Sequence, residues 1–196
     1  MEISESRADT NGTAGSREKE WIERFAAGDQ EALGRLIEVY EPRLYAFCRR
    51  VLISHEDAED AVQETLMKVS QTETFRGTTF KAWIYKIALN ICRSHLRSSN
   101  ARKAREETSG QEAMAEPPRM GTPKRVFDER ERAREVAAAM DTLPEEQREV
   151  LVLKYIDDLS VEEIEEISGL PGSTIKGRLR HGRTKLRKIL ELRGIQ

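Results

Sequence analysis

Cysteine is scarce in this chain of 196 residues, and no long apolar run is present. The two cysteines, Cys48 and Cys92, lie far apart and lack metal-ligand spacing, so we expect buried thiols rather than a disulfide framework or a redox switch. No apolar stretch approaches membrane-spanning length, and the N-terminus has no signal-peptide core. The sequence therefore predicts a cytoplasmic protein.

Residue patterns typical of catalytic sites are missing as well. The chain has no Ser/His/Asp arrangement, metal-ligand cluster or glycine-rich phosphate loop, and His55, His95 and His181 are isolated from any ligand pattern. We therefore expect no enzymatic activity, no cofactor and no bound metal. Aromatic residues make up only 6% of the chain and charged residues 35%, which favours small helical bundles over one large core.

The net charge of −2 hides an uneven distribution along the chain. Residues 75–105 contain eight Lys or Arg and no acid, whereas residues 128–166 contain fourteen acids against five bases. Basic and acidic blocks that alternate in this way predict one face suited to DNA and another suited to a different partner.

Apolar residues recur at helical spacing through most of the chain, which predicts an all-α protein. We expect two small helical domains joined by a flexible linker: a disordered tail over 1–18, an N-terminal domain over 19–98, a linker over 99–125 and a C-terminal helix-turn-helix domain over 126–196. Pro42 should kink or split its helix. The expected helix N-caps are Asp29, Ser54, Thr79 and Thr142, the last with Pro144 near the first helical position.

A helix expected from Phe80 onward has an apolar side and a polar side. On the polar side Lys86, Asn90, Arg93 and Arg97 are spaced i, i+4, i+7 and i+11, and we name these four residues the polar stripe. Basic side chains beside exposed aromatic rings suit single-stranded nucleic acid. Phe80 and Trp83 fit core packing better, and the residues left open for nucleic-acid contact are Phe75, Arg76 and Tyr85.

The stretch 160–190 predicts two short helices joined by a tight turn. Ser160 and Glu163 form a capping box, Gly169 is placed for a left-handed residue, and Pro171 cannot continue the first helix. This is a helix-turn-helix pattern. An ordinary helical hairpin with a solvated basic face is the alternative interpretation.

The second of these helices carries only positive charge. Ser173 or Thr174 should cap it, and its N-terminal turn is the part that normally reaches base edges in the major groove. Glu165, on the first helix, stands where a small residue is usual, so it must tilt outward or find a basic partner. The buried stripe is expected to be Ile175, Leu179, Leu186 and Leu190; the basic residues are Lys176, Arg178, Arg180, Arg183, Lys185, Arg187 and Lys188.

Three segments in order, at 57–65, 80–90 and 143–183, are together more specific than the helix-turn-helix alone. In them and across most of the chain, the sequence resembles a bacterial RNA polymerase sigma factor of the extracytoplasmic-function class. The resemblance implies that the third helix docks on core RNA polymerase through an acidic face that also carries a methionine. From the residues alone, this face could also be ordinary solvated surface. We name this face the acidic face; its residues are Asp57, Asp60, Gln63, Glu64 and Met67.

The resemblance also implies promoter DNA as a partner. The helix after Phe80 and its preceding loop would recognise the −10 element and capture an unstacked base of the non-template strand. The C-terminal helix-turn-helix would read the −35 element, and the linker would thread the polymerase active-site channel. Ser94 stands where the family usually has aspartate, which implies a missing local salt bridge or an altered promoter preference. Base-edge candidates are Ser173, Thr174, Lys176 and Arg180; phosphate candidates are Arg178, Arg183 and Lys185; −10 candidates are Phe75, Arg76, Lys86, Asn90, Arg93 and Arg97.

Control of such a protein is expected to come from a separate anti-sigma factor. Three other interpretations remain. A stand-alone helix-turn-helix regulator would bind two-fold symmetric operators as a dimer. A nucleic-acid enzyme would need a carboxylate cluster, and an adaptor would leave the basic faces unused.

Overall fold

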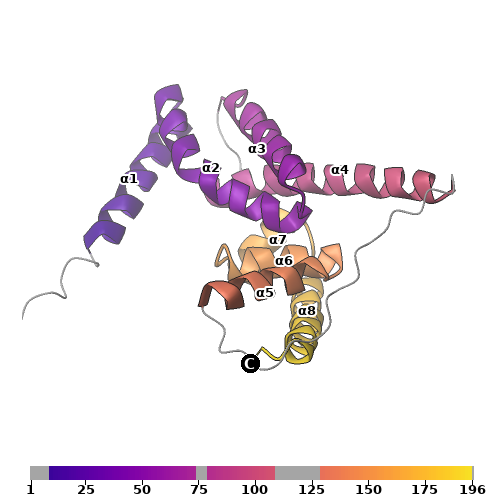
Figure 1. Cartoon of the computed structure of the whole chain (residues 1–196). Coiled ribbons are helices and arrows are strands. Elements are labelled where there is room, and N and C mark those ends of the chain that lie inside the picture. The colour runs from indigo at the N-terminus through magenta and orange to yellow at the C-terminus, as the bar shows by residue number, and fades with distance from the viewer. Residues whose placement is uncertain (1–8, 74–78, 109–128, 196) are drawn as a thin grey trace, which may run out of the picture.

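The computed structural model describes residues 9–73, 79–108 and 129–195. Within these ranges the chain forms eight helices and no strand, which confirms the all-α prediction. Figure 1 shows four helices, α1 to α4, above a second group of four, α5 to α8. We name these groups the N-terminal module and the C-terminal module.

The N-terminal module consists of α1 (Asp9–Ala26), α2 (Gln30–Leu52), α3 (His55–Ser70) and α4 (Phe80–Thr108). Each of the three predicted caps is present: Asp29 Oδ1 accepts from the amides of Glu31 and Ala32, Ser54 Oγ from Asp57, and Thr79 Oγ1 from Ala82. The helices begin where local side-chain acceptors satisfy their first amides.

Two helices are longer than the sequence predicted. Helix α1 already begins at Asp9, inside the expected tail, and α4 continues to Thr108, into the expected linker. Alanine, arginine and lysine between 101 and 105 are strong helix formers and include no breaker, so nothing local ends α4 at residue 98. Helix α2 is continuous across Pro42, where buried Tyr40 and Leu44 anchor both sides, so of the expected kink or split the split does not occur.

The core of the N-terminal module is built around aromatic rings. The Phe80 ring meets Phe25 and Tyr40 edge-on, with centroids 6.1 and 5.2 Å apart. Behind them Cys48 of α2 and Cys92 of α4 are fully buried free thiols with sulfur atoms 3.6 Å apart. The hydrogen bond to Cys48 and burial raise the pKa of the Cys92 thiol, which keeps it protonated and unreactive.

The C-terminal module consists of α5 (Glu129–Asp141), α6 (Glu145–Tyr155), α7 (Val161–Ser168) and α8 (Gly172–Leu192). The capping box of Ser160 and Glu163 is present, and Gly169 ends α7 with a φ of 70°, as predicted. Two predicted caps are wrong, because Pro144 and Pro171 are themselves the N-cap residues of α6 and α8. The Thr142 hydroxyl instead donates to Ala139 O at the end of α5.

The two modules pack directly against each other. Helix α4 lies against α7, and α2 lies against α6 (Figure 1). Buried apolar side chains of both modules belong to one continuous cluster, including Leu44 and Tyr85 on one side and Leu153 and Ile164 on the other. The described parts of the two predicted domains therefore share a core in this structure.

Candidate nucleic-acid interface

Helix α8 presents most of its predicted DNA-binding residues to solvent. Ile175 and Leu179 are buried beneath them, so the apolar stripe predicted for these two positions is confirmed. Gly182 lies where α8 crosses α6: a Cβ there would stand 2.8 Å from Leu151 Cδ1. Exposed candidates are Ser173, Lys176, Arg180, Arg183 and Lys185, while Thr174 and Arg178 are half-buried.

Arg178 is already engaged within the C-terminal module. Its guanidinium lies 2.9 Å from Glu146 Oε2 of α6. Because the Glu146 side chain is 71% exposed, the pair is weak and does not prevent Arg178 from turning toward a phosphate.

Glu165 has a partner that the sequence did not predict. Its carboxylate accepts a hydrogen bond from the backbone amide of Gly172, the first residue of α8. Pro171, the N-cap, makes no side-chain capping bond, so Glu165 supplies the missing cap from the neighbouring helix. Of the two expected outcomes, Glu165 follows the first: its side chain is exposed, and it pairs with the positive end of the helix backbone instead of a basic side chain.

The polar stripe on α4 is only partly open. Lys86, Asn90 and Arg97 are exposed, but Arg93 points into the module interface. Its guanidinium donates to both carboxylate oxygens of Glu149, at 2.6 and 3.0 Å, and to Ser168 O at 3.1 Å. The side chain of Glu149 is only 8% exposed and that of Arg93 26%. In this arrangement α6 and α7 of the same chain occupy the donors of Arg93.

Tyr85, which remained open as a base-stacking residue, is fully buried. Its ring packs edge-on against Phe47 at 5.2 Å, and its hydroxyl donates to Asp157 Oδ1 at 2.6 Å. The prediction that Phe80 and Trp83 pack in the core is confirmed, although Trp83 is only partly buried. The remaining aromatic candidate, Phe75, and its neighbour Arg76 lie outside the described residues.

Asp157, at the junction of the modules, is half-buried, and its Oδ2 atom is fully enclosed. Burial raises its pKa to about 6, against the lowering effects of the Tyr85 hydroxyl and the nearby Lys81. Lys81 Nζ donates to the Asp157 carbonyl at 2.7 Å, and Asp157 Oδ2 has no hydrogen-bond partner among the described residues. In the sequence, the only sign of this site is an acid between the apolar residues of a short connection.

Arg148 makes a further polar contact between the modules. Its side chain donates to Val51 O, near the C-terminal end of α2, at 2.9 and 3.2 Å, and to Leu143 O at 3.1 Å. Burial lowers its pKa, because none of these acceptors carries a full charge. Carbonyls at the end of α2 are favourable acceptors, because the helix dipole makes that end negative.

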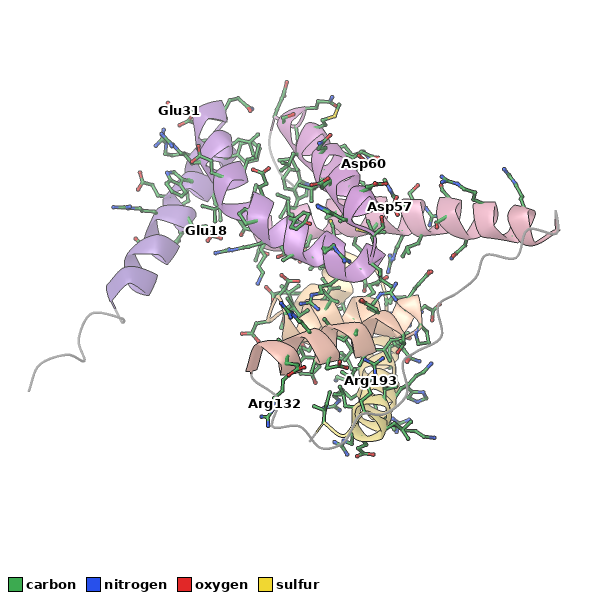
Figure 2. All side chains as sticks on the ribbon, in the orientation of Figure 1. Glu18, Glu31, Asp57, Asp60, Arg132 and Arg193 are labelled. Atoms are coloured by element: carbon green, nitrogen blue, oxygen red, sulfur yellow. The ribbon has the colours of Figure 1, made fainter. Side chains whose placement is uncertain are left out.

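The acidic face lies on α3, where Figure 2 labels Asp57 and Asp60. Asp60, Gln63, Glu64 and Met67 are exposed, Met67 to 60%, and Asp57 is half-buried. His95 of α4 bridges two of these acids, with Nε2 3.0 Å from Glu64 Oε1 and Nδ1 4.0 Å from Asp57 Oδ1. From the sequence we expected His95 to be isolated from any ligand pattern, because both of these acids lie on another helix, α3.

The described parts of the chain show neither a helix long and apolar enough to cross a membrane nor a group of three or more side chains that could hold a metal ion.

Comparison with known proteins identifies both modules. The family model described as Sigma-70 region 2 matches residues 36–102, and Sigma-70, region 4 matches residues 133–186. The ECF RNA polymerase sigma factor SigW of Bacillus subtilis strain 168 is 31% identical over 179 residues, which cover 88% of this chain and 96% of SigW.

Two solved structures share the arrangement of helices. The sigma factor RpoE of Bartonella quintana, solved in complex with the anti-sigma factor NepR, is 26% identical, with a TM-score of 0.63 over 82% of this chain and 97% of that one. CnrH, solved with the cytosolic domain of CnrY, has a TM-score of 0.62 at 24% identity over 89% of this chain and 97% of that one, and supports the fold alone. On the matches to both regions and to SigW, this chain belongs to the ECF RNA polymerase sigma factors.

Proposed function

We propose that this sigma factor reads the −35 promoter element with α8, reads and opens the −10 element with α4, and docks on core RNA polymerase through the acidic face of α3. As a member of its family it directs promoter-specific transcription initiation. The observation that carries the assignment of α8 is its exposed row of lysine and arginine side chains. This helix follows the capped first helix of the helix-turn-helix, and the sequence has no acid between Glu166 and Glu191. Such a surface neutralises phosphates and releases counterions.

At the −35 element the first turns of α8 would enter the major groove. In this proposal, side chains near the N-terminal end would reach base edges, and basic side chains further along the helix would contact the phosphate backbone. The proposed base-edge residues are Ser173, Thr174, Lys176 and Arg180, and the proposed phosphate contacts are Arg178, Arg183 and Lys185.

At the −10 element the polar stripe can bind DNA fully only after Arg93 has left Glu149. Lys86, Asn90 and Arg97 are exposed and can make a first contact. Arg93 becomes available when α4 separates from α6 and α7, and its guanidinium then exchanges the Glu149 carboxylate for DNA phosphates. In this proposal, full binding of the −10 element therefore requires the two modules to separate. Phe75 and Arg76 are proposed as further −10 contacts.

Polymerase docking is assigned to Asp57, Asp60, Gln63, Glu64 and Met67. An exposed acidic surface with an adaptable methionine suits a basic helical partner. The chain itself would catalyse no step, since nucleotide addition belongs to the polymerase, and it would work in the cytoplasm, where transcription takes place.

A separate anti-sigma factor is the proposed regulator. The support is indirect: RpoE of Bartonella quintana, which shares this fold, was solved bound to one. A protein that stabilises contact between the two modules would keep Arg93 occupied and prevent promoter binding.

Run-off transcription with purified core polymerase tests the proposal. A promoter fragment selected by the reconstituted holoenzyme should give a specific transcript, and footprinting should show protection at −35 and opening at −10. Arg183→Ala should weaken promoter binding and reduce the salt slope by about 1. Arg132→Ala is the matched control, because this exposed arginine lies on α5 (Figure 2). Tight duplex binding without polymerase, or no specific transcript, would contradict the proposal.

A further inference from the structure

The turn between α7 and α8 places an acid at the head of an otherwise basic helix. Glu165 is exposed and lies seven residues before Gly172, whose amide donates to its carboxylate. An ideal Cβ at position 172 would lie 2.9 Å from Glu165 Oε1 and 3.2 Å from Cδ. The carboxylate therefore rests against the backbone of the first turn, at the position where a Gly172 side chain would stand.

The Glu165 carboxylate changes the charge that DNA would meet at the first turn of α8. Unpaired amides at a helix N-terminus carry partial positive charge and favour an approaching anion. A DNA phosphate approaching the first turn of α8 would meet the Glu165 carboxylate instead. Ser173 and Thr174, the proposed base-edge residues, follow directly, so the charge stands beside the part of α8 assigned to sequence readout.

We infer that Glu165 is a specificity-determining residue of the −35 interface: its carboxylate caps α8 and keeps the phosphate backbone away from the first turn. Affinity for DNA in general is lowered, and binding depends more on base-edge contacts by Ser173 and Thr174. The inference rests on the proposed use of α8 at the −35 element, and it assigns no new ligand to the helix end.

The chain offers variants that separate the charge of Glu165 from its hydrogen bond. Glu165→Gln removes the charge but keeps an oxygen that can accept from the Gly172 amide. Gly172→Ala keeps the charge but pushes the flexible carboxylate away, since the new Cβ would be too close to it. Glu162→Gln is the matched control, because it removes an exposed acid from the first turn of the same α7.

The measurement is binding of reconstituted holoenzyme to a fluorescent promoter fragment, and to a fragment with a scrambled −35 element, over a range of salt concentrations. For Glu165→Gln we expect about three- to tenfold tighter binding to both fragments at low salt. The slope of log affinity against log salt should become steeper by about 0.9, which corresponds to one further phosphate contact. Discrimination between the two fragments should fall, because the scrambled fragment, which lacks the base-edge contacts, gains more from the added phosphate contact than the promoter fragment does. Glu162→Gln should leave slope and discrimination unchanged.

Gly172→Ala distinguishes charge from capping. If charge determines DNA binding, this variant lowers thermal stability slightly but keeps the salt slope of the parent, since the acid remains near the turn. Weaker binding by Glu165→Gln, or a slope and discrimination equal to those of Glu162→Gln, would overturn the inference. A parent holoenzyme that does not protect the −35 element at all would instead contradict the proposed use of α8.

Discussion

Glu149→Gln should open the contact between the two modules. Glu149 lies on α6 and is 8% exposed, and its carboxylate receives two hydrogen bonds from Arg93 of α4, at 2.6 and 3.0 Å. Glutamine keeps the shape of the side chain but loses the charge and one acceptor. Arg93 is then left at the interface with Ser168 O and one amide oxygen, which do not balance its charge.

The size of the effect follows from burial. Removing one partner of a fully buried ion pair costs about 3–5 kcal/mol. Because Arg93 remains 26% exposed and can recover some hydration, we expect about 2–3 kcal/mol. The ratio of packed to separated modules should fall about 30- to 150-fold. A separated C-terminal module frees Arg93, so binding of a single-stranded −10 oligonucleotide by the holoenzyme should not weaken.

Energy transfer between dyes measures the population of separated modules. Lys68→Cys on α3 and Lys188→Cys on α8 supply exposed labelling sites, while Cys48 and Cys92 are fully buried and remain unlabelled. Glu146→Gln is the control, because Glu146 also lies on α6 but pairs with Arg178 inside the C-terminal module. Identical dye-distance distributions for the two variants would refute the reasoning.

Three further predictions concern stability. Burial raises the pKa of Asp157 to about 6, so the folded protein binds this proton more tightly than the unfolded chain does. The free energy of unfolding should therefore fall as pH rises from about 4 to 6. In urea titrations, Asp157→Asn should remove that part of the pH dependence. Tyr85→Phe leaves the buried Asp157 oxygen without its donor at 2.6 Å and should cost about 1–3 kcal/mol in the same titrations, whereas an unchanged midpoint would contradict the hydrogen bond. Gly182→Ala places a Cβ 2.8 Å from Leu151 Cδ1 and should cost about 1–3 kcal/mol by calorimetry, while Gly177→Ala, with no atom within 4 Å, should stabilise α8 by about 0.5–1 kcal/mol.

The sequence by itself determined the local features of this protein. The caps at Asp29, Ser54 and Ser160, the left-handed Gly169 and the buried face of α8 all follow from residues within a few positions of one another. The sites of charge were equally clear, because the basic and acidic blocks are continuous along the chain. Helix ends without a strong breaker, such as that of α4, were predicted too early because helix-forming residues continue past the last apolar position.

Only the tertiary structure decided which charged residues are available. Arg93 belongs to a polar stripe by its spacing, but it meets Glu149, 56 positions away in sequence. Tyr85 and Asp157 are 72 positions apart, and Arg148 and Val51 97. Helical periodicity places a residue on a face but does not state what covers that face. The packing of α4 and α2 against α6 and α7 turned exposed candidates into interface residues, and it raised the pKa of Asp157 by excluding water.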